Sequence, residues 1–184
     1  MSETAEKFAA TVKEWVGSLR EDVETCKSIV ETEAVDDHAR QFAAAALNYL
    51  VTRLDLVPDH EPTIGTIDDA MVLRVCVNFA TDHNVDEGLD SDVMVETMRL
   101  SNEAERLTDW LEPDLYAKFR KHCERLSETA VRGRTPELIT KDSAARKQLF
   151  EEVGEELLRI PAASFSDPAG ALRQFMSYLQ TKLK

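Results

Sequence analysis

Residues 8–30 read FAATVKEWVGSLREDVETCKSIV, and the apolar side chains of this stretch decide the fold. They recur at steps of three or four residues, at Phe8, Val12, Trp15, Leu19, Val23, Cys26 and Val30. This spacing matches the period of about 3.6 residues of an α-helix with one apolar face, whereas a heptad repeat of about 3.5 predicts a coiled coil. We therefore expect a straight amphipathic helix that packs within a globular domain.

The same periodicity continues along the chain and predicts an all-α protein. Further helices are expected to begin near Asp36–Asp37, near Thr66, near Val93, at Pro113, after Asp142 or Ser143, and at Asp167–Pro168. Breaks are expected at Pro58 and Pro62, in the polar segment 81–92, before Pro113, at a glycine cap near Gly133, and at Pro161. Residues 1–184 are thus predicted to form a single domain. Its architecture is a compact bundle of six or seven mostly antiparallel helices, with a kinked Pro/Gly-rich linker between the second and third.

Composition excludes several classes of protein. The 184 residues carry a net charge of −13, concentrated in the first half of the chain, which repels nucleic acid and anionic lipid. No run of about eighteen apolar residues predicts a membrane-spanning helix, and the charged start is unlike a signal peptide. Cys26, Cys76 and Cys123 lie far apart among apolar positions. They predict buried, reduced thiols and a cytoplasmic location.

Residues 118–147 reverse the acidic trend. Their basic side chains are Lys118, Arg120, Lys121, Arg125, Arg132, Arg134, Lys141, Arg146 and Lys147. One interpretation is that they pair with acids of the same chain or solvate a helix face. The other is a docking site for an acidic protein partner, with Arg125, Arg132 and Arg134 as candidate contacts.

Residues 49–69, YLVTRLDLVPDHEPTIGTIDD, are dense in residues that set backbone geometry. Pro58 and Pro62 fix two φ angles and bias the residues before them away from helix. Gly65 permits a turn that a Cβ would obstruct. Thr66 is expected to cap the following helix in a capping box completed by Asp69.

The aspartates of this segment, Asp55, Asp59, Asp68 and Asp69, allow two interpretations. Each can accept backbone N–H bonds in turns or at a helix start, which would make it structural. Alternatively they converge, together with Glu61, on a hard cation such as Mg²⁺ or Ca²⁺. No other cofactor is indicated by the sequence.

The segment resembles the YkvA-like family, a bacterial domain of unknown function, over residues 39–79. The matching positions are Tyr49, Leu50, Asp55, Leu56, Pro58, Asp59, Pro62, Gly65, Asp68 and Asp69. The resemblance implies a helical hairpin with a kinked linker at about residues 36–82, followed by a helical extension over about 92–184, and implies no reaction. Many members look membrane-associated, but His60 and Glu61 stand where the family has apolar residues, and Arg53 stands where it has proline.

No catalytic constellation stands out, and no catalytic residue is assigned. The histidines show no HExxH spacing, and no Gly-rich phosphate loop is present. The segment from Asp82 fails as an EF-hand, because Gly88 falls one position late and Val93 stands where a bidentate Glu is required. We expect a non-catalytic interaction or regulatory module with a protein partner. The alternatives are a metal-binding protein or metal-dependent enzyme that uses the motif aspartates, and a peripheral membrane protein.

Overall fold

The computed structural model describes residues 3–52, 56–58 and 64–184. The elements are α1 (Glu3–Glu31), α2 (Asp37–Tyr49), α3 (Ile67–Ala80), α4 (Ser91–Glu103), the 3₁₀ helix η1 (Ala104–Asp109), α5 (Pro113–Leu126), α6 (Pro136–Lys141), α7 (Ser143–Leu157) and α8 (Pro168–Lys182). The described residues contain no strand beyond an isolated bridge between Val131 and Arg134. The predicted all-α bundle is confirmed. It holds eight α-helices over these ranges, because the proline turn after Thr135 starts a separate short helix.

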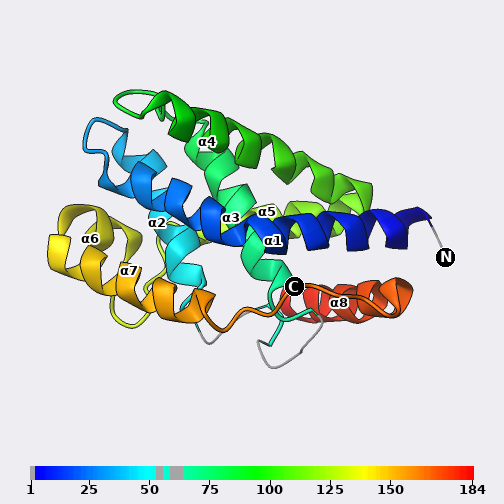
Figure 1. Cartoon of the computed structure of the whole chain (residues 1–184). Helices are drawn as coiled ribbons and strands as arrows, with labels where there is room; N and C mark the ends of the chain where they lie inside the picture. The colour runs from blue at the N-terminus through cyan, green and yellow to red at the C-terminus, as the bar shows by residue number, and fades with distance from the viewer. Residues whose placement is uncertain (1–2, 53–55, 59–63) are drawn as a thin grey trace.

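α3 lies at the centre of the bundle. It packs against α1, α2, α4 and α5, and nearly all of its side chains are buried. α1 is the longest helix and crosses in front of α3, with α4 above it and α8 below its amino-terminal half (Figure 1). The predicted stripe of α1 is buried against these neighbours, with Phe8, Trp15 and Val23 each 0% exposed. A helix that is buried on one face, such as α1, lies at the outside of the bundle. A helix that is buried on nearly all sides, such as α3, lies at its centre.

Three aromatic rings join α8 to the rest of the bundle. Phe8 of α1 meets Trp110 edge to face, with 5.1 Å between ring centroids, and lies 5.9 Å from Phe175 of α8. Trp110 and Phe175 also contact each other at 6.0 Å. Aromatic pairs of this kind contribute about 0.5–1.5 kcal/mol beyond the area they bury. The cluster therefore anchors the last helix to the first.

Two predicted helix starts are confirmed in detail, and two predicted helix ends are wrong. Asp36 accepts the N–H of His38 at 2.8 Å, and Asp167 accepts the N–H of Gly170 at 2.9 Å. The predicted fourth helix, however, ends at Glu103 and tightens into η1. Gly133 does not cap α5, which ends at Leu126. It lies instead at φ +80° in a tight turn closed by the bridge between Val131 and Arg134, where glycine is the residue of lowest strain.

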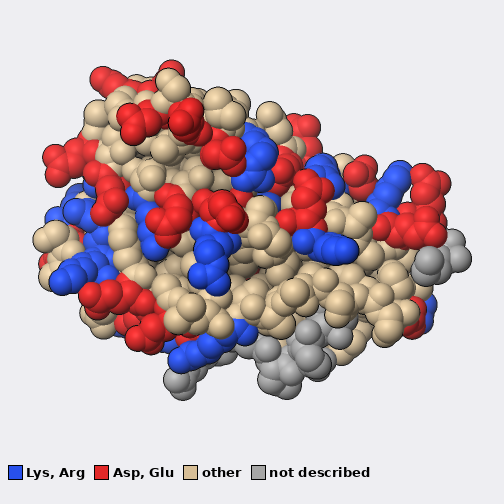
Figure 2. All heavy atoms as spheres, in the orientation of Figure 1, with Lys and Arg blue, Asp and Glu red and all other residues tan. Residues whose placement is uncertain are grey.

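The surface is acidic but mixed. Figure 2 shows Asp and Glu side chains over α1 and α4, with Lys and Arg between them. The three cysteines are buried and free, as predicted. Within the described ranges, no helix combines the length and the apolar character needed to cross a bilayer.

Candidate functional site

Tyr49 and Asp68 form a buried hydrogen-bonded pair that joins the end of α2 to the start of α3. The Tyr49 hydroxyl donates to Asp68 Oδ2 at 2.7 Å. The N–H of Leu56 donates to the same hydroxyl at 2.9 Å, and the N–H of Val57 donates to Asp68 Oδ2 at 3.1 Å. Burial raises the pKa of Tyr49 well above its ordinary value, and the charge of Asp68 adds to this, so Tyr49 stays a protonated donor. The motif thus uses these two side chains to satisfy linker amides that have no helical partner.

The predicted capping box at Thr66 is wrong. Thr66 directly precedes α3. Among the described residues, however, its side chain accepts no hydrogen bond from the backbone N–H groups of the first turn of that helix. Its ψ is 0°, whereas Asp36 and Thr135, whose side chains do cap, have extended backbones with ψ of 138° and 156°. The extended conformation turns a cap oxygen towards the free N–H groups.

The other predicted motif residues divide into two groups. Asp69 and Gly65 are buried at the start of α3, and Pro58 is half-buried in the linker. Asp55, Asp59 and Pro62 lie outside the described residues, as do Arg53, His60 and Glu61. The structure therefore places Asp68 and Asp69 in one turn and gives no positions for the other two aspartates. The shared cation site among the four stays a prediction.

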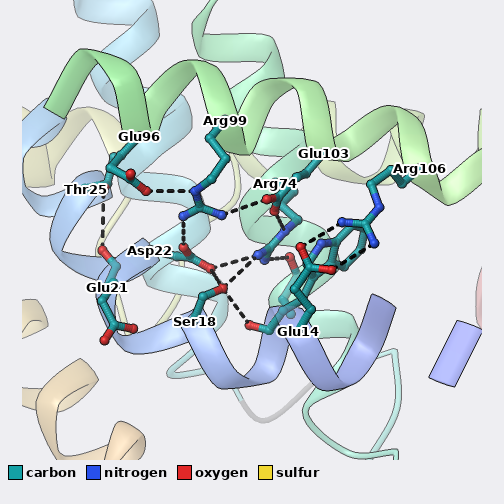
Figure 3. A network of polar contacts seen from close by, with 12 residues as sticks. Glu14, Ser18, Glu21, Asp22, Thr25, Arg74, Glu96, Arg99, Glu103 and Arg106 are labelled. Carbon is teal, nitrogen blue, oxygen red and sulfur yellow. Dashed lines mark hydrogen bonds and ion pairs between the residues drawn. The ribbon is translucent and has the colours of Figure 1, made fainter. Parts of the chain in front are cut away.

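A buried ion cluster between α1, α3 and α4 was not predicted from the sequence (Figure 3). The Arg74 guanidinium, fully buried on α3, donates to Asp22 Oδ2 at 2.9 Å and to Glu103 Oε2 at 2.7 Å. It also donates to Ser18 Oγ at 3.1 Å and stacks over the Trp15 ring at 4.4 Å from the centroid. Burial lowers the pKa of Arg74, and the two carboxylates oppose that shift. A guanidinium stays charged under these opposing effects because its ordinary pKa is above about 12.

Arg99 of α4 completes the cluster. It donates to Asp22 Oδ1 at 2.5 Å, to Glu103 Oε1 at 2.9 Å and to Glu96 Oε2 at 2.8 Å. The two oxygens of Asp22, like those of Glu103, are therefore divided between two guanidinium groups. Carboxylates held in this way stabilise neighbouring charges and are poorly placed to take a proton from a substrate. The cluster therefore joins α1, α3 and α4 to one another.

The basic segment 118–147 is largely paired within the chain. The partners of these basic side chains are Asp114 for Lys118, Asn78 for Arg120, Glu152 for Arg132 and Arg134, Glu137 for Lys141, and the carbonyls of Ile139 and Thr140 for Arg146. Arg134 is only 5% exposed and holds Glu152 through two bonds, so it is no free contact for a partner. Among the described residues, Arg125 makes no ion pair and faces a pocket.

That pocket has a volume of about 300 Å³ and lies between α2 and α5. Its lining includes Asn48, Tyr49, His122, Arg125, Leu126 and Val131. Asn48 donates to the Arg134 carbonyl at 3.0 Å, but Asn48 Oδ1 and His122 Nε2 have no hydrogen-bond partner among the described residues. Burial, and then the charge of Arg125, lowers the pKa of His122, so its ring is neutral near pH 7. Because these two polar atoms lie in an otherwise largely apolar pocket, the pocket is suited to bind a group that is partly polar.

A basic hollow between α5 and the end of α8 adjoins this pocket. It is lined by Lys118, Lys121, His122, Arg125, Lys182, Leu183 and Lys184. His122 and Arg125 line both the pocket and the hollow. The arrangement joins an apolar recess to a cationic rim, a combination that can bind an anionic group attached to an apolar one.

Comparison with known proteins identifies a family for one segment. Residues 39–74 match the model of a family described as "Protein of unknown function (DUF1232)". The match lies within the residues on which the resemblance to a bacterial domain of unknown function was based, and it confirms that resemblance for this part of the chain. No curated protein and no solved structure matches the chain.

Proposed function

We propose that the chain is a non-catalytic helical interaction module that binds an acidic segment of a protein partner on α5. The observation that carries this proposal is the gathering of Lys118, Lys121, Arg125 and Lys182 around His122 in a chain whose net charge is −13. Of these four cations, only Lys118 has an ion-pair partner, Asp114, among the described residues. Like charges placed together at a surface cost free energy unless a partner neutralises them. A binding role accounts for that cost.

The chemistry of the described ionisable groups supports binding over catalysis. Asp22 and Glu103 are divided between two guanidinium groups, and Asp68 accepts from Tyr49 and a linker amide. Burial raises the pKa of the Cys26 and Cys123 thiols well above the ordinary value, which disfavours the nucleophilic thiolate. These groups are therefore committed to structure or held in inactive protonation states.

The pocket beside the basic hollow indicates the chemistry of the partner. Acidic side chains would pair with the α5 cations, and a neighbouring apolar side chain would enter the recess lined by Leu126 and Val131. Exposed charge pairs add mainly to the association rate and weaken with salt, whereas the buried apolar anchor supplies most of the affinity. We thus expect a partner segment that alternates acidic and apolar residues.

The test is cross-link-assisted capture from the native cell with three proteins. These are the wild type, the triple variant Lys118→Gln, Lys121→Gln, Arg125→Gln, and a control, Lys13→Gln, Lys141→Gln, Lys147→Gln, that removes the same charge elsewhere. We expect a partner cross-linked through an acidic segment, recovered by the wild type and the control and lost from the triple variant. Its recovery should fall as salt rises. Equal recovery by all three proteins would contradict the proposal.

A further inference from the structure

Three side chains that can bind metal converge where the α1–α2 connection meets the α3–α4 loop. They are Asp36, which precedes α2, His38 in the first turn of α2, and His83, which follows α3. Among the described residues, one ligand atom from each of these three side chains lies within 4.8 Å of the other two. It is separate from the motif aspartates, and none of its three residues lines the α5 pocket.

The distances fit a single ion of the zinc type. Asp36 Oδ1 lies 3.5 Å from His38 Nδ1 and 3.9 Å from His83 Nδ1. Tetrahedral Zn²⁺ with bonds of about 2.0–2.1 Å holds its ligand atoms about 3.3 Å apart. Ligand atoms as far apart as 4.8 Å therefore need to approach by only about 1.5 Å, which rotation of an exposed His38 side chain can supply.

The backbone around the group is fixed before any ion binds. The N–H of Asp36 donates to the Asn84 carbonyl at 3.0 Å and ties the two connections together. Close packing of Gly88 on Ala34 adds to this, since a Cβ at Gly88 would lie 2.9 Å from Ala34 Cβ. Little conformational freedom is therefore lost on metal binding.

The three ligand side chains already lie side by side. Asp36 accepts the backbone N–H of His38 at 2.8 Å, which holds its carboxylate beside the two imidazoles. The His83 ring stacks at 5.2 Å on His38 and at 5.9 Å on Phe42. The His38 and His83 ring planes are nearly parallel, 19° apart, so binding of one ion requires the exposed His38 ring to rotate out of this stack while His83 stays against Phe42.

We propose that Asp36, His38 and His83 bind one divalent transition-metal ion of the zinc class. Two imidazoles and one carboxylate favour Zn²⁺ over Mg²⁺ and Ca²⁺, which prefer sets of oxygen ligands. Three protein ligands leave a coordination position for water or for a partner's side chain. Both histidines also line an open groove of about 470 Å³ with Lys121, Glu124 and Arg125, so an exchangeable ligand has access from that side.

The site can be tested by titrating the metal-free full chain with Zn²⁺ in a calorimeter and with Co²⁺ in a spectrophotometer at pH 7.5. The variants are Asp36→Asn, His38→Ala and His83→Ala. Asparagine is as good a helix cap as aspartate, so Asp36→Asn removes the charge and retains the cap. Controls are His60→Ala and His122→Ala, which remove the other two histidines of the chain.

We expect one ion per chain, an intense visible Co²⁺ spectrum, and retained binding in both controls. Each of the three ligand variants should bind at least about tenfold more weakly, since even outer-shell changes cost about 10–100-fold. Metal-free melting curves identify any variant that is misfolded. Absence of binding by the wild type overturns the proposal. So does Zn²⁺ affinity that is unchanged in His38→Ala and His83→Ala.

Discussion

The Arg74 guanidinium and the Asp22 carboxylate meet at 2.9 Å, and both side chains are 0% exposed. A charge placed in a protein interior has lost its hydration, so its stability depends on its partner. This pair joins the central helix α3 to α1, and Glu103 and Arg99 extend it to α4. The cluster therefore aligns three helices.

Asp22→Ala is expected to lower the free energy of unfolding by about 3–5 kcal/mol, because it leaves Arg74 buried with its charge less well compensated. The control is Glu14→Ala, which removes the exposed Arg106–Glu14 pair at 3.0 Å and should cost less than about 1 kcal/mol. Urea denaturation measures both changes. The double variant Asp22→Leu, Arg74→Met should recover part of the loss, since it removes both charges. Equal losses for Asp22→Ala and Glu14→Ala would contradict this account.

Tyr49→Phe is expected to destabilise the protein by about 1–3 kcal/mol. The substitution retains the ring but removes the hydroxyl that donates to Asp68 and accepts from the Leu56 amide. Tyr116→Phe is the matched control, because within the described chain the Tyr116 hydroxyl makes no hydrogen bond and the ring is half-buried. Thermal melts compare the two variants. A loss for Tyr49→Phe no larger than that for Tyr116→Phe would contradict a stabilising role of the Tyr49 hydroxyl.

Asp68→Ala is expected to destabilise the protein whether or not Mg²⁺ or Ca²⁺ is present. The variant loses the acceptor of the Val57 amide and of the Tyr49 hydroxyl. Melts of wild type, Asp59→Ala and Asp68→Ala are to be recorded on chelator-treated protein, then with millimolar Mg²⁺ or Ca²⁺. A cation bound only to the native state raises the melting temperature with its concentration. A rise in the wild type that both variants lose would establish the cation site among the motif aspartates.

His122 is expected to make stability fall as the pH drops below 6.5. The folded-state pKa of His122 is lowered from 6.5 by burial and then by Arg125. Between the folded and unfolded values, the unfolded chain binds the additional proton, so the free energy of unfolding rises with pH and its His122 contribution is complete above 6.5. Urea denaturation from pH 7.5 to 5 gives the free energies of unfolding of wild type and His122→Gln. The pH dependence of their difference is the contribution of His122. An NMR titration midpoint for His122 at or above 6.5 would contradict it.

The helices could be predicted because each carries its own periodic signal. The stripe from Phe8 to Val30 lies wholly within α1, and the caps at Asp36 and Asp167 are local patterns of a few residues. The Thr66 cap was wrong for a physical reason. The pattern of residue types fits a capping box, but the turn after the linker gives Thr66 a helical ψ. Sequence identifies the residue that can cap, whereas the backbone decides whether it does.

The ion cluster could be predicted only in part. Arg74 is separated from Asp22 by 52 residues and from Glu103 by 29, and no local spacing encodes these pairings. A partial signal exists, because Asp22 lies between Leu19 and Val23 on the buried stripe and Arg74 interrupts an apolar run. A charge at a buried helical position requires a partner, although the sequence does not say which. The same holds for His83, which only the tertiary fold brings to Asp36 and His38.

The segment that matches a family, residues 39–74, contains most of α2 and the first half of α3, and both helices are buried on nearly every side. Its own residues cannot provide that burial, because α1, α4 and α5 cover it and all three lie outside the match. A covering helix needs only one apolar stripe, and many sequences satisfy that requirement. The segment therefore depends for its burial on helices that lie outside it. We expect residues 39–74, excised from this chain, to expose their alanine-rich faces and to aggregate.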